Sequence, residues 1–96
     1  MMAEDFMKYI EDEIINKGRV HTILWLTEEG GIILPGKLKE TTIEDELSIR
    51  LHFDKTSYKI NLLEINTSED QDIDALVLDH ENYKFMFTTT DDIQRS

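Results

Sequence analysis

The sequence contains no cysteine, and this absence excludes several kinds of protein. With no thiol in 96 residues, the chain can form neither a disulfide framework nor a thiolate metal site. A domain of this length must therefore be held together by its hydrophobic core alone. Disulfides persist mainly in oxidising compartments, so their absence favours a cytoplasmic location.

Basic residues and long apolar runs are scarce as well. Ten lysines and arginines stand against 21 aspartates and glutamates, which gives a formal net charge of -11. This charge repels phosphate backbones and anionic lipids, so we expect no direct binding to nucleic acid or membranes. Residues 1–5 are acidic where a secretory signal carries positive charge, and no apolar run approaches the length of a membrane span. The expected partner is a basic protein.

The chain nevertheless has enough apolar residues to fold. Its hydrophobic fraction of 40% separates it from acidic chains that stay disordered because they cannot bury enough apolar surface. We therefore predict a single domain over residues 1–96, in which residues 91–96 fray at the end of the chain.

Residues 3–16 predict an amphipathic helix. One arc of the helical wheel holds the apolar side chains of Ala3, Phe6, Met7, Ile10 and Ile14. Gly18 is positioned to adopt the left-handed conformation that ends a helix.

After Gly18 the apolar pattern changes to the period of a β-strand. The predicted strands are residues 20–27, 32–34, 47–53, 58–65, 75–78 and 83–87. Pro35 and Gly36 indicate that the second strand lies at a sheet edge or contains a bulge. Leu63 and Ile65 have the opposite parity to Tyr58 and Ile60, which requires a bulge or a strand buried on two faces. Segments 40–46 and 66–74 are predicted to be acidic loops.

These elements predict an α+β fold. The N-terminal amphipathic helix would pack on a five- to six-stranded antiparallel meander sheet or a small curled barrel, because the connections are too short for parallel crossovers.

No arrangement of residues typical of an active site is found. The three histidines are scattered over two predicted strands and a turn, and Gly30-Gly31 lacks the lysine and the following helix of a phosphate-binding loop. We therefore interpret the chain as non-catalytic, without a cofactor or a metal. A small hydrolase would require carboxylates such as Glu64 and Asp79 to converge in one pocket.

One acidic segment has the spacing of a calcium-binding loop. Asp70, Asp72 and Asp74 are followed at the twelfth position by Glu81. Ala75 stands where such a loop needs glycine, and the flanking segments are predicted strands rather than helices. We predict that calcium does not bind there.

The acidic residues themselves are the most unusual feature, because they gather in predicted turns and loops. The candidate protein-binding residues are Glu28, Glu29, Glu44, Asp45, Glu46, Glu69, Asp70, Asp72 and Asp74, together with Trp25 as an apolar contact. Two interpretations remain open. The charges either keep a small protein soluble, or form an acidic face that imitates the phosphates of a nucleic acid and occupies a basic groove.

Two short stretches carry a resemblance to a known family. The segment Ile23-Leu24-Trp25-Leu26-Thr27-Glu28-Glu29 resembles the first strand of small phage-encoded uracil-DNA glycosylase inhibitors, and Ala75-Leu76-Val77-Leu78 is similar to a late strand of theirs. The sequence departs from the family at His21-Thr22, where those inhibitors carry an acidic residue and a hydroxyl residue before the first strand. It departs again at Gly30-Gly31, which blocks the helix that follows their glutamate pair. The resemblance implies a phage-type decoy but not a glycosylase target.

The leading hypothesis is a non-catalytic acidic protein-binding module, a phage-type or mobile-element inhibitor of a basic nucleic-acid-handling enzyme or defence nuclease. The alternative is a small cytoplasmic domain that binds a ligand or self-associates through its sheet, with Ile23, Trp25 and Ile33 as the apolar patch.

Overall fold

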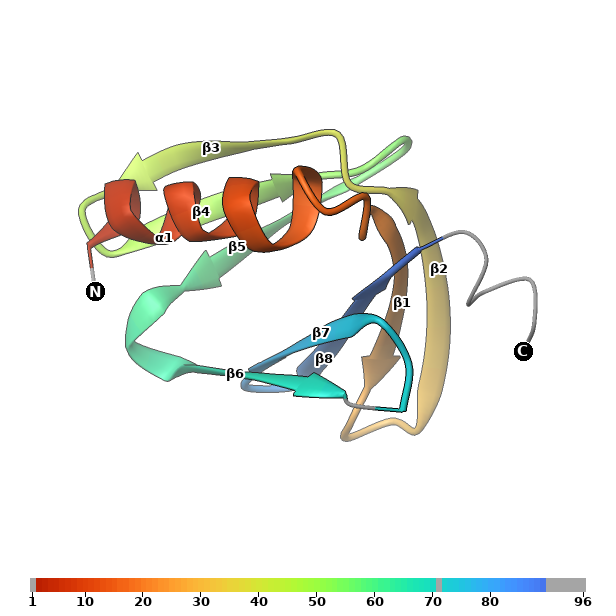
Figure 1. Cartoon of the computed structure of the whole chain (residues 1–96). Helices are drawn as coiled ribbons and strands as arrows, with labels where there is room; N and C mark the ends of the chain where they lie inside the picture. The colour runs from red at the N-terminus through yellow and green to blue at the C-terminus, as the bar shows by residue number, and fades with distance from the viewer. Residues whose placement is uncertain (1, 71, 90–96) are drawn as a thin grey trace.

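The computed structural model describes residues 2–70 and 72–89, and these form the predicted α+β fold (Figure 1). A helix, α1 (Ala3–Ile10), continues into a π-helical turn, η1 (Glu11–Ile15). The strands that follow are β1 (His21–Leu26), β2 (Gly31–Lys37), β3 (Glu40–Asp45), β4 (Ser48–His52), β5 (Ser57–Asn61), β6 (Ile65–Asp70), β7 (Ala75–His80) and β8 (Tyr83–Thr88). Residues 91–96, predicted to fray, lie outside the described residues. None of the helices in the described ranges is long and apolar enough to span a membrane.

Within the described residues the strands form two antiparallel sheets rather than one. The larger sheet has five strands in the order β2-β1-β8-β7-β6, and the smaller has three in the order β3-β4-β5. The larger sheet is not a simple meander, because β1 pairs with β8 along its whole length, from His21 opposite Thr88 to Leu26 opposite Tyr83. This pairing joins the first and the last strand of the described chain, and neither sheet closes into a barrel.

The helix lies along β3 and β4 and closes the core between the two sheets (Figure 1). Its first turn is anchored by the Ala3 N–H, which donates to the Glu46 carbonyl oxygen at 2.9 Å. The helical side chains that the sequence placed on the apolar arc are buried, apart from the half-buried Met7. The core consists of Ala3, Phe6, Ile10, Ile14, Leu24, Leu38, Ile49, Leu51, Phe53, Ile60, Leu62, Leu76, Leu78, Phe85 and Phe87.

The second half of the predicted helix is wound differently from the first. The Asn16 N–H donates to the Glu11 carbonyl oxygen at 2.8 Å, which is the i→i+5 bond of a π-helical turn. Gly18 then adopts a positive φ of 73° and ends the helical segment, as the sequence indicates.

Both predicted acidic loops are wrong in part, because most of their residues form strands. Residues 40–45 are β3, which pairs with β4 from Glu40 opposite His52 to Asp45 opposite Ser48. Residues 65–70 are β6, which pairs with β7. Each of the two is the edge strand of its sheet, so its charged side chains remain in water while its backbone pairs on one side only. Acidic composition therefore did not prevent strand formation.

A short helical turn resolves the change of parity between Tyr58 and Ile65. Residues Leu62–Glu64 form a 3₁₀ turn, η2, in which the Asn61 side chain accepts a hydrogen bond from the Leu63 N–H at 3.1 Å. This turn ends β5 and starts β6, so the expected bulge or two-sided strand is not formed. Leu62 is buried, and Leu63 is 73% exposed.

The second strand of the first hairpin lies at a sheet edge and also contains a bulge. The register of β1 and β2 shifts between Thr22 and Leu24, opposite the segment that contains Pro35. Gly36 has a φ of 96°, and a Cβ atom there would lie 2.3 Å from Asp54 Oδ2. Glycine is therefore required by both the backbone angle and the close approach of Asp54.

The predicted strand over residues 47–53 and the last hairpin are confirmed with small differences. Ile49, Leu51 and Phe53 are buried, whereas Leu47 is 38% exposed because β4 begins one residue later. In the last hairpin His80 belongs to β7, and Glu81 adopts a φ of 44° in the tight turn to β8.

Candidate protein-binding site

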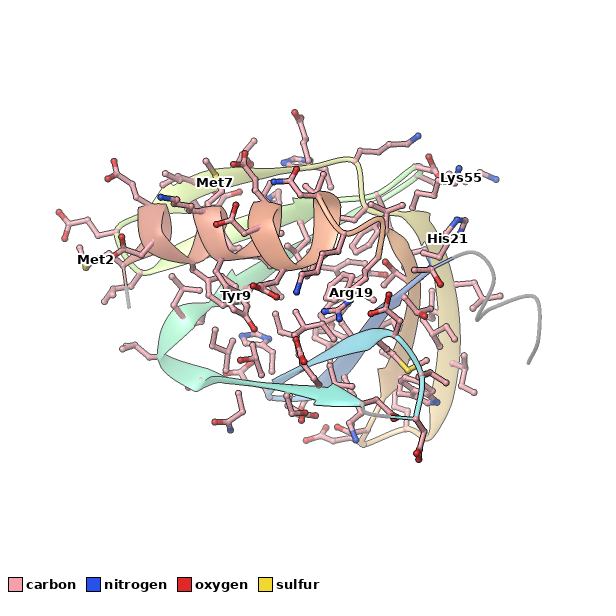
Figure 2. All side chains as sticks on the ribbon, in the orientation of Figure 1. Met2, Met7, Tyr9, Arg19, His21 and Lys55 are labelled. Atoms are coloured by element: carbon pink, nitrogen blue, oxygen red, sulfur yellow. The ribbon has the colours of Figure 1, made fainter. Side chains whose placement is uncertain are left out.

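The start of the helix and the β3–β4 turn form a surface hollow with an acidic rim, which we call the acidic hollow. It has a volume of about 460 Å³ and is lined by Met2, Ala3, Glu4, Asp5, Ile43, Asp45 and Glu46. Met2 and Ile43, 46% and 45% exposed, contribute large apolar side chains to the lining, and Met2 stands at the N-terminal end of the helix in Figure 2. Four carboxylates therefore share one hollow with exposed apolar surface.

None of these four carboxylates is in an ion pair within the described part of the chain. Asp45 is instead held by the backbone, because its Oδ1 accepts a hydrogen bond from the Leu47 N–H at 2.9 Å. This bond lowers the pKa of Asp45 below its ordinary value. Asp45 thus keeps its negative charge, and its position is set by the turn.

Glu44, the third acid of the predicted loop, has a different role. Its carboxylate accepts a hydrogen bond from Arg50 Nε across the β3–β4 pair, and this bond lowers the pKa of Glu44. The structure therefore separates Glu44, which is neutralised by Arg50, from Asp45 and Glu46, which line the acidic hollow.

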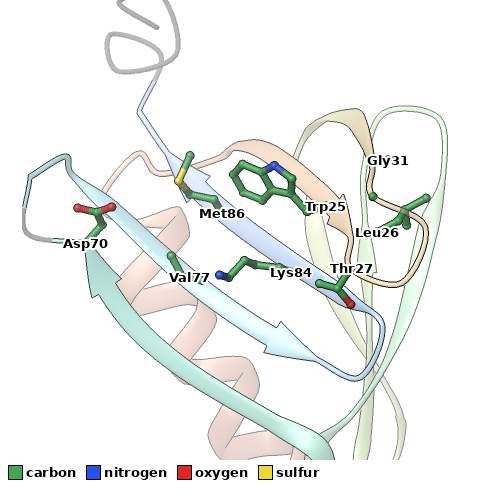
Figure 3. A pocket seen from close by; sticks show the side chains of 9 residues that line it. Trp25, Leu26, Thr27, Gly31, Asp70, Val77, Lys84 and Met86 are labelled. Atoms are coloured by element: carbon green, nitrogen blue, oxygen red, sulfur yellow. The ribbon is translucent and has the colours of Figure 1, made fainter.

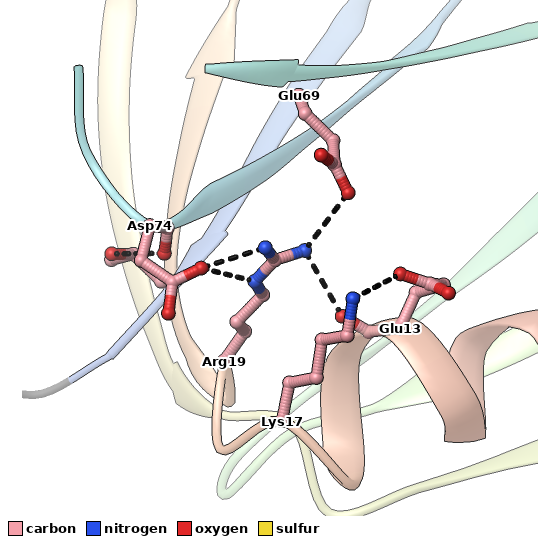
Figure 4. A network of polar contacts seen from close by, with 6 residues as sticks. Glu13, Lys17, Arg19, Glu69 and Asp74 are labelled. Carbon is pink, nitrogen blue, oxygen red and sulfur yellow. Dashed lines mark hydrogen bonds and ion pairs between the residues drawn. The ribbon is translucent and has the colours of Figure 1, made fainter. Parts of the chain in front are cut away.

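The acids between Glu69 and Asp74 do not form one open acidic face either. Arg19, only 7% exposed, donates from Nε to Asp74 Oδ1 at 2.8 Å, and its Nη1 lies 3.5 Å from Glu69 Oε1 (Figure 4). Burial opposes the charge of Arg19, but the hydrogen bonds to Asp74 and Glu69 outweigh it and raise the pKa of the guanidinium. Asp70 accepts a hydrogen bond from the Asp72 N–H at 2.9 Å. Two of the four predicted acids are therefore paired within the protein.

Glu28 and Glu29 lie in the exposed turn between β1 and β2, as predicted. They border a small hollow of about 240 Å³ that is also lined by Leu26, Ile33, Tyr58, Asn82 and Tyr83. No ion pair involves either glutamate within the described residues.

Trp25 lies on the outer face of the larger sheet, on the side away from α1 (Figure 3). The hollow around it, which we call the Trp25 hollow, has a volume of about 490 Å³ (Figure 3). It is lined by Trp25, Leu26, Thr27, Gly30, Gly31, Asp70, Val77, Lys84 and Met86. It is shallow and mainly apolar, and among the described residues that line it Asp70 is the only one with a carboxylate. Trp25 is therefore separate from most of the acids with which the sequence grouped it.

Metal-ligand side chains meet at one place in the described residues. Ligand atoms of Glu64, His80 and Glu81 all lie within 4.8 Å of one another. His80 Nε2 accepts a hydrogen bond from the Asn61 N–H at 3.0 Å, so a neutral ring carries its hydrogen on Nδ1, which is buried without a partner. A neutral imidazole has one free lone pair, and here the backbone uses it. The ring could bind a metal only by giving up that hydrogen bond.

The residues of the calcium-like spacing are divided by a strand. Asp70, Asp72 and Asp74 lie before β7, whereas Glu81 follows it, and six strand residues extend over about 20 Å. Asp74 is bound to Arg19, and Gln71, within the same segment, lies outside the described residues. Glu64 and Asp79 do not converge either, because Glu64 lies with His80 and the neighbouring Asp79 points to the opposite face of β7.

Sequence reasoning missed Glu4 and Asp5 as site residues. Acidic residues in the first turn of a helix are ordinarily explained by a favourable interaction with the helix dipole. The bond from Ala3 to Glu46 joins residues far apart in the chain, and no local pattern reports such a contact.

Comparison of this chain with known proteins finds no relative. No protein-family model, curated protein or solved structure matches it.

Proposed function

We propose that this protein is a non-catalytic module that binds a basic protein partner through the acidic hollow. The observation that carries the proposal is the meeting of Glu4, Asp5, Asp45 and Glu46 around the exposed side chains of Met2 and Ile43. Acidic residues that only keep a protein soluble do not need exposed apolar side chains among them, whereas a binding surface combines the two.

The chemistry of the acidic hollow suits an arginine or lysine side chain. Such a side chain can lay its aliphatic stem on Met2 and Ile43 while its charged end reaches the carboxylates. The carboxylates can also raise the association rate, because opposite charges steer the partners together at low salt.

The class of partner that we propose is a nucleic-acid-handling enzyme, such as a defence nuclease, which the module inhibits as a nucleic-acid mimic of phage or mobile-element origin. The net charge of -11 supports this class of partner, because a basic groove built for phosphates also attracts carboxylates. The sequence hypothesis assigned binding to all of the acidic segments. Here we propose that only the acidic hollow contacts the partner.

The experiment is affinity capture from lysate at low salt with immobilised wild-type protein, with captured proteins identified and then released by duplex DNA. We expect a basic nucleic-acid-binding protein that DNA displaces. The triple variant Glu4→Gln, Asp5→Asn, Glu46→Gln should weaken its binding at least about tenfold, because each lost charge-assisted contact contributes about 1 kcal/mol or more.

A second triple variant provides the control, because it removes the same charge elsewhere. Glu28→Gln, Glu29→Gln, Asp72→Asn should bind almost as wild type. Equal weakening by the two variants would mean that only net charge matters. If neither variant weakens binding, the partner does not use the acidic hollow, and its contact should be sought at the Trp25 hollow.

A further inference from the structure

The free edge of β2 differs from every other sheet edge in the described chain. Strands β3, β5 and β6 are also edge strands, and each carries at least one charged side chain that discourages pairing with another molecule. β2 has no charge before Lys37. Its residues Ile32 and Leu34 are 63% and 74% exposed, and Ile33 is 37% exposed.

Only the first part of this edge is open to another strand. Pro35 has no N–H to donate, and the Lys37 N–H is already bound to Asp54 Oδ2 at 3.1 Å. The open segment is therefore residues 31–34, which coincides with the exposed apolar side chains. An exposed edge of this kind is a template for strand addition.

The charges at the two ends of β2 are opposite in sign. Glu28 and Glu29 precede the strand and Lys37 ends it, and none of the three is in an ion pair within the described residues. Asp54, beside Lys37, is already paired with Lys39 at 3.1 Å. One edge thus has an acidic end, an apolar centre and a basic end.

We infer that the partner of this edge is a second copy of the same chain, paired antiparallel through β2. A two-fold pair centred on Ile33 places Ile32 opposite Leu34 of the second copy and brings the turn with Glu28 and Glu29 beside the second copy's Lys37. The same surface serves both copies, as a closed two-fold interface requires. An edge with one sign of charge would repel itself, whereas this one is complementary to its own copy.

The dimer leaves the acidic hollows free. In Figure 1 the N-terminal start of α1 and β2 lie on opposite sides of the molecule, so the two hollows face away from the shared edge. The inference therefore does not depend on the proposed function.

Sedimentation velocity at 0.15 M salt tests the inference, because a Debye length of about 8 Å limits repulsion between two acidic copies. We expect the wild-type mass to rise from monomer to dimer between about 1 μM and about 1 mM, the range expected for a short interface. Leu34→Lys should abolish the rise. The matched control Leu63→Lys, at a position 73% exposed and away from β2, should dimerise as wild type. Both replacements lie at exposed positions, so the two monomers should unfold at the same temperature.

A charge exchange tests the antiparallel register. Glu29→Lys and Lys37→Glu should each weaken dimerisation about three- to tenfold, because two symmetric pairs become repulsive. The double variant Glu29→Lys, Lys37→Glu has the wild-type net charge and should regain most of the affinity. A wild type that stays monomeric overturns the inference, as does equal loss in Leu34→Lys and Leu63→Lys. A double variant no better than either single one overturns the antiparallel register.

Discussion

His80 shows how one buried side chain can depend on its surroundings. It is 5% exposed, its Nε2 accepts the Asn61 N–H, and its Nδ1 has no partner in the described residues. Burial lowers the pKa of His80 below its ordinary value, and the charge of Glu64 opposes that shift. Protonation would place a hydrogen on the atom that accepts the backbone bond, so the neutral ring is the form that fits the fold.

This environment predicts a loss of stability in mild acid. The unfolded chain binds the His80 proton at a higher pH than the folded protein, so the contribution of the neutral ring is complete above about pH 6.5 and is lost as the pH falls toward the folded pKa. We expect the free energy of unfolding, measured with urea, to decrease between about pH 7 and about pH 5.5. His80→Gln keeps an acceptor for Asn61 and should reduce this decrease.

His52→Gln is the control, because His52 lies on the smaller sheet with its Nε2 2.7 Å from Thr42 Oγ1. It makes the same exchange away from the buried His80 ring, so a smaller decrease in both variants would not be specific to His80. If His80→Gln loses stability with acid as steeply as wild type does, His80 is not the group that responds.

At the scale of elements, Arg19 joins parts of the chain that are far apart in sequence. Its Nη1 donates to the Glu13 carbonyl oxygen at 3.2 Å, and its Nη2 lies 2.6 Å from Asp74 Oδ1 (Figure 4). The end of the helical segment is thereby tied to the loop before β7. Acids that seemed from sequence to be available for a partner contribute instead to internal packing.

Arg19→Met should therefore destabilise the fold by about 1 to 3 kcal/mol, because it removes several charge-assisted hydrogen bonds while the half-exposed acids remain solvated. Thermal unfolding measures the loss, and hydrogen exchange should show faster opening of the β6–β7 hairpin. Lys17→Met removes only the exposed pair with Glu13 and should leave both measurements unchanged. Equal effects of the two variants would contradict the bridging role of Arg19.

At the scale of the whole molecule, excess negative charge works against the compact state. Only some of the 21 aspartates and glutamates are paired with a cation in the described residues. The fold has a radius of gyration of 12.5 Å, so many negative charges lie close together. Salt should relieve the repulsion between the carboxylates by more than it weakens the ion pairs. The ion pairs are mostly exposed, and exposed pairs contribute little to stability.

We therefore expect potassium chloride to raise the melting temperature by several degrees between about 0.01 M and about 0.3 M, since the Debye length shrinks from about 30 Å to below 10 Å. About 4 to 8 °C corresponds to each kcal/mol in a domain of this size. The triple variant Glu4→Gln, Asp5→Asn, Glu46→Gln should gain less from the salt. A melting temperature that is flat or falls with salt would show that the ion pairs outweigh the repulsion.

The elements that local pattern predicts well are those whose burial is decided within a few residues. The helical segment from Ala3 to Ile15 and the strand around Leu51 have one apolar face each, and that face packs into the core. The loops predicted over residues 40–46 and 66–74 were wrong in part, because β3 and β6 form by pairing with β4 and β7. A charged edge strand shows little of the apolar alternation that identifies a strand in sequence.

The acidic hollow was predicted only in part, because some of its residues are close in sequence and others are far apart. Asp45 and Glu46 could be singled out, because an acidic turn is a local feature. Glu4 and Asp5 could not be placed beside them, and Asp74 could not be assigned to Arg19, because those contacts join distant residues.

By itself, the sequence determined that this chain is acidic, has an α+β fold and cannot form disulfides, since composition and periodicity set those properties. Only the tertiary structure decided how the strands divide into two sheets, which carboxylates are neutralised, and which four surround an apolar hollow. The physical reason is that charge and periodicity belong to each residue and its neighbours, whereas pairing across a sheet depends on how distant segments pack together.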